Sequence, residues 1–331
     1  MPRPLPAAAD LISAIQAGDR AALGRTITLL ESTRPEHLVR AREVITGLED
    51  KRPKATPLTL RVGITGAPGA GKSTLIEVLG SMLTARGHRV AVLAIDPSSA
   101  ISKGSILGDK TRMEHLSADE RAFIRPSPSS ENLGGVARKT RETIALVEAA
   151  GYEIIFIETV GTGQSEIAVH SMTDVFLLVL LPGAGDELQG IKRGIVEMAD
   201  ILAVNKSDGE RIKTAQQAKA NYHNATHLLP TKSSGWAPKI VLCSAIENTG
   251  ITELWKVVEA YTTATRQNDW LTQNRKQQAQ YWLHEAIQQG LQSLFSQNTA
   301  VREVLAKMEQ AVTQGTISPF IAAEKVLQAF K

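Results

Sequence analysis

The sequence predicts an α/β fold in which a doubly wound, mostly parallel sheet carries helical extensions at its N- and C-terminal ends. Short, nearly continuous apolar runs recur through the middle of the chain and alternate with amphipathic stretches. Strands that are apolar on both faces and separated by helices are typical of a parallel sheet covered on two sides. Before and after this region, apolar residues follow helical spacing. The expected regions are therefore residues 1–57, 58–264 and 265–331.

Residues 1–57 are expected to form an N-terminal helical extension. Asp10 and Asp19 precede apolar residues at helical spacing, as helix-capping residues do, and Gly18 lies where a first helix would end. A third amphipathic stretch follows over residues 38–48. The charged segment "EDKRPKATPL", with its two prolines, is typical of a linker to the next region.

Residues 58–264 are expected to contain the sheet. Between the apolar runs, amphipathic stretches predict helices, among them residues 132–150 and 187–199. The β-branched and apolar composition of the runs is typical of buried parallel strands. The runs are "LRVGIT", "RVAVLAID", "EIIFIETV", "DVFLLVLL", "DILAVNK" and "KIVLCSA".

Residues 265–331 are expected to form a C-terminal helical arm. One helical stripe of apolar residues is followed by a second over residues 301–312, and Pro319 begins a last helix. The arm is short for a core of its own, so it packs either on the main region or on its own copy in a dimer, and a dimerisation arm is the role that we expect. The first stripe consists of Leu283, Ile287, Leu291 and Leu294.

Composition limits the classes of function. The 331 residues include 37 basic and 34 acidic side chains, a balance that does not indicate a nucleic-acid or membrane surface. Cys243 is the single cysteine, which excludes a disulfide framework and a multi-cysteine metal site. The N-terminus has no uninterrupted apolar segment, and the apolar run over residues 175–181 is too short to span a bilayer. We therefore expect a cytoplasmic protein without a nucleic-acid or membrane partner.

The stretch "GAPGAGKS", residues 66–73, matches the phosphate-binding loop G-x-x-x-x-G-K-[ST] between a strand and a helix. Its glycines let main-chain N–H groups turn toward phosphates, Lys72 reaches the β- and γ-phosphate oxygens, and the Ser73 hydroxyl binds Mg²⁺. This loop predicts the P-loop NTPase class. The expected phosphate-site residues are Gly66, Ala67, Pro68, Gly69, Ala70, Gly71, Lys72, Ser73 and Thr74.

A second motif selects the base. Asn205-Lys206-x-Asp208 fits N-K-x-D at the end of a later apolar run. The carboxylate of Asp208 can accept hydrogen bonds from N1–H and the exocyclic amine of guanine, whereas adenine presents the wrong donors and acceptors. Lys206 would lay its stem along the base. The end of the next run adds three candidates to the guanine pocket: Ser244, Ala245 and Ile246.

The string "IETVGTGQ" is expected beside the γ-phosphate. Glu158 ends a strand and can hold Mg²⁺ through water, and the Gly161 amide can sense the γ-phosphate. Common regulatory GTPases have an aspartate in place of Glu158 and a water-orienting glutamine next to the glycine. Here the nearest glutamine is Gln164, two positions too far along. We therefore expect slow intrinsic hydrolysis.

Two further acidic residues are candidates for the same crevice. Asp96, in "AIDPSS", ends another strand, and ligands bind at the carboxyl ends of parallel strands. A cap for the turn before Pro97 is the alternative role for Asp96. The glycine- and serine-rich segment that follows contains Asp109 and is expected to be a switch loop over residues 97–115. An ordinary surface loop is the alternative there.

Together, "GAPGAGKST", "AIDPSS", "GDKTRM", "IETVGTGQSE", "PGAGDELQGIK" and "NKSD" closely resemble the GTPases associated with methylmalonyl-CoA mutase, of the MeaB/ArgK type. The resemblance covers nearly the whole chain. It implies a homodimeric G protein that assists the loading of adenosylcobalamin into the mutase and protects or reactivates that enzyme. GTP and GDP would be its ligands, with Mg²⁺ as cofactor.

The resemblance also implies roles for single residues. It places Ser73, Asp96, Asp109 and Glu158 around Mg²⁺, and it makes residues 183–192 a further switch that responds to nucleotide and partner. A plain strand-to-helix connection is the alternative for that segment. Gln189 and Lys192 could there swing toward the phosphates. The resulting catalytic set is Lys72, Asp96, Asp109, Glu158, Gly161, Gln189 and Lys192.

Three other functions share some of these features. A metallochaperone GTPase for another metalloenzyme would need clustered soft ligands, but Cys243 stands alone, and His223 and His227 fit two solvent-facing side chains better than a metal site. An ATPase or kinase of a basic amino-acid transport system is a role attached to this family by name, and the guanine motif argues against ATP. An RNA-associated G protein would need a basic surface.

Overall fold

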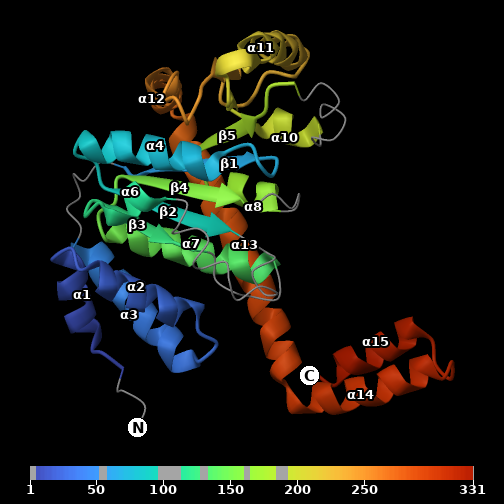
Figure 1. Cartoon of the computed structure of the whole chain (residues 1–331). Coiled ribbons are helices and arrows are strands. Elements are labelled where there is room, and N and C mark those ends of the chain that lie inside the picture. Colours follow the sequence, from blue (N-terminus) through green and yellow to red (C-terminus); the bar gives the residue numbers. More distant parts are fainter. Residues whose placement is uncertain are drawn as a thin grey trace. The chain divides into compact units, whose positions relative to one another are not determined.

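The computed structural model describes residues 5–51, 58–95, 113–126, 133–159, 165–183 and 193–330. The chain forms two compact units, Met1–Asn274 and Arg275–Lys331. In Figure 1 the elements of both units are coloured along the sequence, from blue at the N-terminus to red at the C-terminus.

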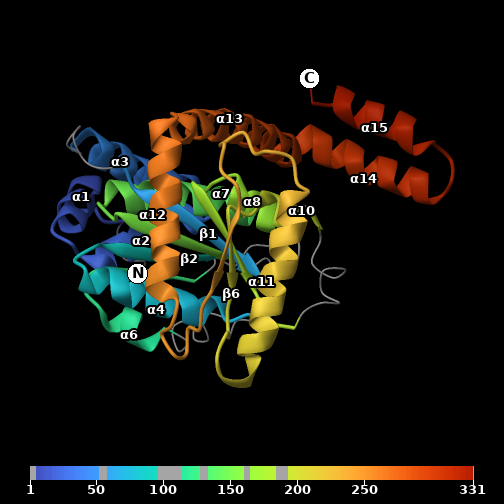
Figure 2. The ribbon, with the colours of Figure 1, turned by 90° about the horizontal axis from the view of Figure 1, so that it is seen from above.

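The first unit contains a seven-stranded sheet whose strand pairs in the described ranges are all parallel. The strand order is β3-β2-β4-β1-β5-β6-β7 (Figures 1 and 2). The expected doubly wound parallel sheet is thus confirmed. The strands are β1 (Leu60–Gly66), β2 (Val90–Ile95), β3 (Ala122–Arg125), β4 (Ile154–Thr159), β5 (Val175–Leu180), β6 (Ile201–Val204) and β7 (Lys239–Leu242).

Six of these strands coincide with the six apolar runs of the sequence, and β3 is the one that the sequence pattern did not predict. The strand has four residues, "AFIR", and it pairs only with β2 at one edge of the sheet. Such a short run carries no clear period, so the sequence pattern assigns no strand to it.

The register places β1 between β4 and β5, and the carboxyl ends of these three strands lie side by side. Ile64 of β1 pairs with Glu158 of β4, and Gly66 pairs with Val179 of β5. The order of the strands along the chain reverses around β1, and in open parallel sheets ligands bind at the carboxyl ends of the strands beside such a reversal. The sheet therefore brings the loop after β1 and the carboxylate at the end of β4 to one crevice.

Helices cover both faces of the sheet. In the first unit these and the connecting helices are α4 (Lys72–Ala85), α6 (Glu114–Ala118), α7 (Leu133–Ala149), α8 (Ser165–His170), α10 (Arg193–Met198), the 3₁₀ turn η1 (Gly209–Arg211), α11 (Ile212–His227) and α12 (Ile251–Gln267). The helix expected over residues 187–199 is present as α10, and residues 187–192 lie outside the described ranges.

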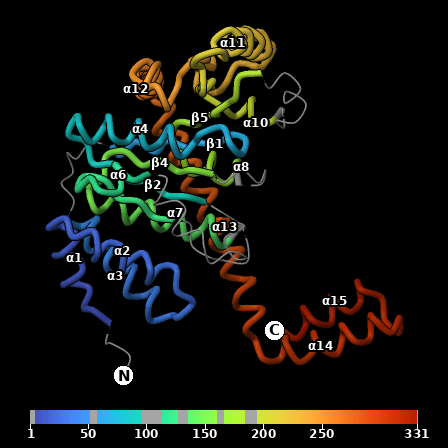
Figure 3. The backbone as a smooth tube through the Cα atoms, viewed as in Figure 1, coloured from blue at the N-terminus to red at the C-terminus, as the bar shows by residue number. Residues whose placement is uncertain are grey.

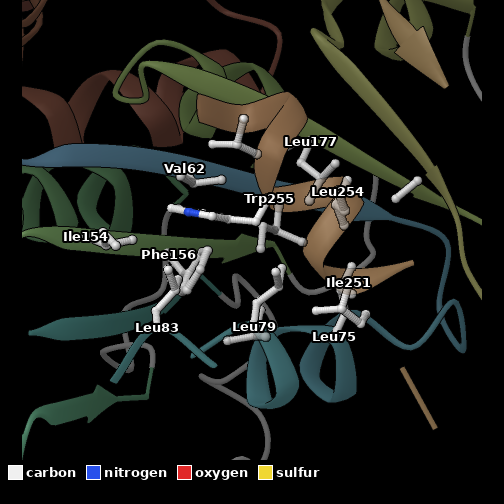
Figure 4. Close-up of a cluster of buried hydrophobic side chains, with 14 of the residues drawn as sticks. Val62, Leu75, Leu79, Leu83, Ile154, Phe156, Leu177, Ile251, Leu254 and Trp255 are labelled. Carbon is white, nitrogen blue, oxygen red and sulfur yellow. The ribbon is translucent and has the colours of Figure 1, made fainter. Parts of the chain in front are cut away.

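A hydrophobic core lies between the sheet and the two helices α4 and α12 (Figure 4). Leu75 and Leu79 of α4 and Trp255 of α12 pack there with Val62 and Phe156 of the strands. The rings of Phe156 and Trp255 meet edge to face with their centroids 6.4 Å apart, a favourable aromatic geometry. This core holds α4, and with it the loop that precedes α4, against β1.

The opposite face of the sheet is covered in part by α8. At Gly63 of β1, a side chain would lie on the face opposite α4, and its Cβ would be 2.9 Å from the Val169 side chain in α8. Helix α7 packs against β2 and against α8. The two faces are therefore both closed, as the apolar runs of the sequence predicted.

The N-terminal extension consists of α1 (Ala8–Gln16), α2 (Arg20–Glu31) and α3 (Pro35–Lys51). Asp19 caps α2, and its carboxylate accepts hydrogen bonds from the amides of Ala21 at 2.7 Å and Ala22 at 3.0 Å. Asp10 lies inside α1 and does not cap it, so the capping role predicted for Asp10 is wrong. The cap of α1 is Ala7, whose side chain has no acceptor.

This extension is attached to the sheet domain by polar contacts. Arg20 donates to the carbonyl oxygens of Asp119 at 2.6 Å and Ala122 at 2.9 Å. Glu31, at the end of α2, pairs with Arg125 of β3. Helices α2 and α3 also pack against α7. The first three helices thus belong to the same compact unit as the sheet.

Helix α13 (Trp270–Gln297) starts in the first unit and continues into the second, which also contains α14 (Thr299–Thr313) and α15 (Pro319–Gln328). The last two pack against each other as a hairpin (Figure 3). Asn298 caps α14. Pro319 occupies the first turn of α15, as the sequence predicted. The four side chains of the first apolar stripe, Leu283, Ile287, Leu291 and Leu294, are all exposed.

Candidate nucleotide-binding site

The loop between β1 and α4 requires glycine at the two positions that the motif specifies, Gly66 and Gly71. Gly66 has a φ of 146°, and a Cβ there would strike the carbonyl oxygen of Val179. Gly71 has a φ of 86°, and a Cβ there would lie 2.6 Å from Nδ2 of Asn205. Side chains are disfavoured by both the backbone conformation and the space. The motif glycines therefore let the loop lie close to β5 and to the loop after β6.

Lys72 is the first residue of α4, and its ammonium group lies over the loop. Its Nζ donates hydrogen bonds to the carbonyl oxygens of Gly66 at 2.8 Å and Ala67 at 3.2 Å. The residue is 8% exposed, and this burial lowers the pKa of Lys72, while the carboxylates of Glu158 and Glu166 oppose the shift. A positive charge at a helix N-terminus complements the negative charge of a nucleotide phosphate.

Ser73 and Glu158 meet across the crevice. The Ser73 hydroxyl donates to Oε1 of Glu158 at 2.9 Å, and Glu158 is buried at the end of β4. Hydroxyl and carboxylate oxygens are the ligands that Mg²⁺ uses beside nucleotide phosphates. The donor set therefore fits the predicted Mg²⁺ site, although within the described ranges no group of three or more metal-ligating side chains is present.

Asn205 ties the loop after β6 to the phosphate loop. Its Nδ2 donates to the carbonyl oxygen of Ala70 at 2.8 Å, and its Oδ1 accepts from the amide of Ala245 at 3.1 Å. The side chain is 1% exposed. One buried amide group therefore fixes three loops relative to one another, because both of its ends are used.

Asp208 lies in the predicted base-binding loop. Its Oδ2 accepts a hydrogen bond of 2.5 Å from the Ser244 hydroxyl, which itself accepts from the amide of Glu247 at 3.2 Å. The Ser207 amide donates to the carbonyl oxygen of Cys243 at 3.0 Å and joins the same two loops. These contacts hold the Asp208 carboxylate in place, as a base-reading acceptor requires. Ile246, on the same loop, is 78% exposed.

The structure thus brings together two groups of predicted residues: the phosphate loop over residues 66–74, and the base loops over residues 205–208 and 244–246. Glu158 joins the first group through Ser73. The other predicted site residues lie outside the described ranges, and their roles remain predictions: Asp96, Asp109, Gly161, Gln164, Gln189 and Lys192.

Glu166 is a charged residue of this site that the motif analysis did not single out. It is 6% exposed near the start of α8, and its carboxylate acts electrostatically on Lys72. In the sequence it belongs to the string "GQSE", whose glutamate matches no general phosphate or base motif. Only the folded position of α8 beside β1 and β4 reveals the proximity.

A Glu158→Gln variant tests the cation site. We expect the Mg²⁺ concentration for half-maximal GTP hydrolysis to rise at least about tenfold, because a neutral amide is a weaker ligand than a carboxylate. GDP binding in EDTA should change little. The measurement is hydrolysis across a Mg²⁺ titration, with Glu153→Gln, an exposed residue just before β4, as matched control. An unchanged Mg²⁺ requirement in Glu158→Gln would remove this residue from the cation site.

An Asn205→Ala variant tests the connection between the loops. The change leaves the Ala70 carbonyl and the Ala245 amide without this partner, which costs about 1–3 kcal/mol per buried group. We expect a lower melting temperature and at least tenfold weaker GDP binding. Asn224→Ala, at an exposed position of α11, is the control. If GDP affinity stayed at the level of the control, the three loops would not depend on Asn205.

Comparisons with known proteins cover most of the chain. A family model described as "Methylmalonyl Co-A mutase-associated GTPase MeaB" matches residues 23–300 of the chain.

Among the helices that the structure describes, none combines the length and the apolar character that a bilayer crossing requires.

Several curated proteins are similar over most of the chain. The mouse protein "Methylmalonic aciduria type A homolog, mitochondrial" is 46% identical over 97% of this chain and 79% of its own length. The Escherichia coli "GTPase ArgK" is 42% identical, with 94% of this chain and 93% of its own covered. Among solved structures, a "LAO/AO transport system kinase" superposes with a TM-score of 0.74 at 34% identity, over 97% of this chain and 96% of that one.

Proposed function

The chain belongs to the family of methylmalonyl-CoA mutase-associated GTPases, and from this premise we propose that it is the GTP-hydrolysing chaperone of an adenosylcobalamin-dependent methylmalonyl-CoA mutase. In this role it would assist cofactor loading and protect or reactivate the mutase. The single observation that carries the GTPase part is the joining of a phosphate loop to a guanine-type loop through Asn205. The mutase part is supported by the description of the family and the name of the mouse relative.

The phosphate end of the site would act by position and charge. Lys72 would exchange its contacts to the Gly66 and Ala67 carbonyls for the β- and γ-phosphate oxygens of GTP, helped by the loop amides and the N-terminus of α4. Ser73 and Glu158 would hold Mg²⁺, which neutralises phosphate charge when bound. On sequence grounds, Asp96, Asp109 and Gly161 complete this end.

The base end would select guanine through Asp208. A carboxylate accepts both N–H groups on the Watson–Crick edge of guanine, whereas the corresponding edge of adenine presents an acceptor and one donor. The Ser244 hydroxyl and the loop after β7 hold that carboxylate. Selectivity of this kind is strong, because a wrong base leaves polar groups without partners.

Coupling to the mutase would use the two switch segments that the sequence predicts, residues 97–115 and 183–192. Binding of the γ-phosphate would order them and hydrolysis would release them. Gln189 and Lys192 would act in the second segment. Slow intrinsic hydrolysis would suit such a switch, since the partner could then complete the catalytic site.

The chaperone would act as a homodimer in the cytoplasm. The support for a dimer is the exposed apolar stripe of α13, of which Leu283 is 59% and Leu294 is 62% exposed. Contiguous exposed apolar side chains indicate an interaction surface.

Transport energisation by ATP is the second candidate, because one similar solved protein is named a LAO/AO transport system kinase. The held carboxylate of Asp208 favours guanine over adenine and so speaks against this candidate. Affinities of the purified protein for GDP and ADP separate the two functions directly. Tight ADP binding with weak GDP binding would favour the transport role.

The experiment for the proposed function compares GTP hydrolysis by the chain alone and with the cobalamin-dependent acyl-CoA mutase of the same cell, together with co-elution on a sizing column. We expect a complex and a rate increase of tenfold or more, which corresponds to about 1.4 kcal/mol off the barrier. The Lys72→Ala variant with the same mutase is the control. Absence of a complex in every nucleotide state would leave the GTPase without this partner.

A further inference from the structure

The sheet ends at β7, and the far side of this strand has no strand partner among the described residues. On its inner side, the amide of Lys239 donates to the carbonyl oxygen of Asp200 at 3.3 Å, and that of Cys243 donates to Val204 at 2.9 Å. In a parallel ladder alternate residues face opposite sides. The main-chain groups of Ile240 and the amide of Leu242 therefore point to the open side, which is a template for a further strand. Gly250, just before α12, lies against the Leu242 carbonyl oxygen, so the open stretch ends there.

A groove of about 710 Å³ runs along this open side. All four residues of β7 line it, and α11 and α12 form its walls. In Figure 2, these two helices run on either side of the strands at this end of the sheet. Val257 of α12 and Trp236, before β7, give the groove apolar surface. The groove thus combines a free strand edge with side-chain walls, the geometry by which extended peptides are bound.

The charges that line the groove are mostly positive. Lys219 of α11, Lys239 of β7 and Lys256 of α12 are exposed around it, against the single acidic residue Glu253. The ammonium group of Lys239 also lies 5.8 Å from the centroid of the Trp236 ring. Positive charge on three separate elements around one groove is complementary to an acidic partner.

The groove is separate from the nucleotide site. None of the residues that bind or hold the phosphate loop and the base loops, such as Asn205, Asp208 and Ser244, is part of its lining. The base loop nevertheless begins directly after β7, at Cys243. A ligand on the groove would therefore leave the nucleotide pocket free.

We propose that this groove binds an extended acidic segment of a partner protein, which adds to the sheet as an eighth strand beside β7. Main-chain hydrogen bonds to Ile240 and Leu242 provide the pairing, and acidic side chains of the segment lie near Lys219, Lys239 and Lys256. A compact anion would use the lysines alone and leave the strand edge unpaired. Lysine on an edge strand also discourages self-association, and this protective role is the alternative that the test must separate.

The probe is a set of capped, fluorescein-labelled decapeptides with glutamate at alternate positions and Val, Ile, Thr or Tyr between. We expect saturable binding by fluorescence anisotropy and slower hydrogen exchange at the amides of Ile240 and Leu242. Lys239→Glu should weaken binding at least tenfold, and Lys213→Glu, an exposed lysine of α11 outside the groove, less than twofold. N-methylation of alternate peptide amides should also weaken binding at least tenfold, because it removes the pairing donors.

Retained GDP binding by Lys239→Glu shows that the variant is folded. The outcome of the peptide-binding test does not depend on whether the mutase is the partner of this chain. The proposal is overturned if no peptide of the set binds saturably. It is equally overturned if the N-methylated peptides or polyglutamate bind as well as the parent set, which would leave a general anion surface. If the parent chain binds none of the peptides and the Lys239→Val variant self-associates, the lysines protect the strand edge against self-association.

Discussion

Replacement of Lys72 by alanine is expected to lower the rate of GTP hydrolysis by about 10²- to 10³-fold, the cost of removing one preorganised charge from a phosphate-transfer site. The ammonium group has two contacts to loop carbonyls and little solvent access, so its removal takes away the positive charge that is held over the loop. Release of phosphate under single-turnover conditions measures the rate, and mant-GDP titration measures binding separately.

Lys213→Ala is the matched control, since it removes an exposed lysine from the same unit without touching the site. The control should hydrolyse GTP at the parent rate. Parent-level turnover by Lys72→Ala, with an unchanged melting temperature, would show that the phosphate site lies elsewhere.

Replacement of Asp208 by asparagine is expected to change the preferred base from guanine to xanthine. The carboxylate accepts from two guanine N–H groups, and hydrogen bonds to a charged group contribute about 1.5–3 kcal/mol each. Loss of part of this pairing should weaken GDP binding at least about 100-fold. The asparagine amide can donate to the extra carbonyl of xanthine, so XDP should then bind more tightly than GDP.

Competition of GDP and XDP against mant-GDP measures this change. Glu210→Gln, an exposed acidic residue two positions further along, is the control and should keep the guanine preference. The Ser244 hydroxyl can still donate to the asparagine oxygen, so the loop should keep its structure. An unchanged preference for GDP in Asp208→Asn would count against the base assignment.

The sheet could be predicted from the sequence because its buried strands are nearly all apolar and its glycine-rich loop has a fixed spacing. Six runs of this kind became β1, β2, β4, β5, β6 and β7. The prediction failed at β3, where Ala122–Arg125 is too short to show a period and is recognised only by its pairing with β2. It failed also at Asp10, because an acidic residue near a helix start can lie in the first turn as well as at the cap.

The local parts of the site could be predicted, but its long-range contacts could not. Phosphate and base loops each show a continuous motif, whereas the Asn205 to Ala70 contact joins positions 135 residues apart. Glu166 belongs to no general motif and approaches Lys72 only through the placement of α8. Similarly, the stripe of α13 could be predicted as a helix face, while its exposure is a property of the folded chain.

The most direct test of the account is the activity of the mutase over repeated turnover, measured with and without this protein. Apo-mutase and adenosylcobalamin are mixed with the parent chain and GTP, with the parent chain and GDP, or with Lys72→Ala and GTP. The account predicts that mutase activity is sustained longest with the parent chain and GTP, and that Lys72→Ala with GTP gives no such protection. Equal decay of mutase activity in all mixtures, despite normal GTP hydrolysis by the parent chain, would contradict the chaperone role.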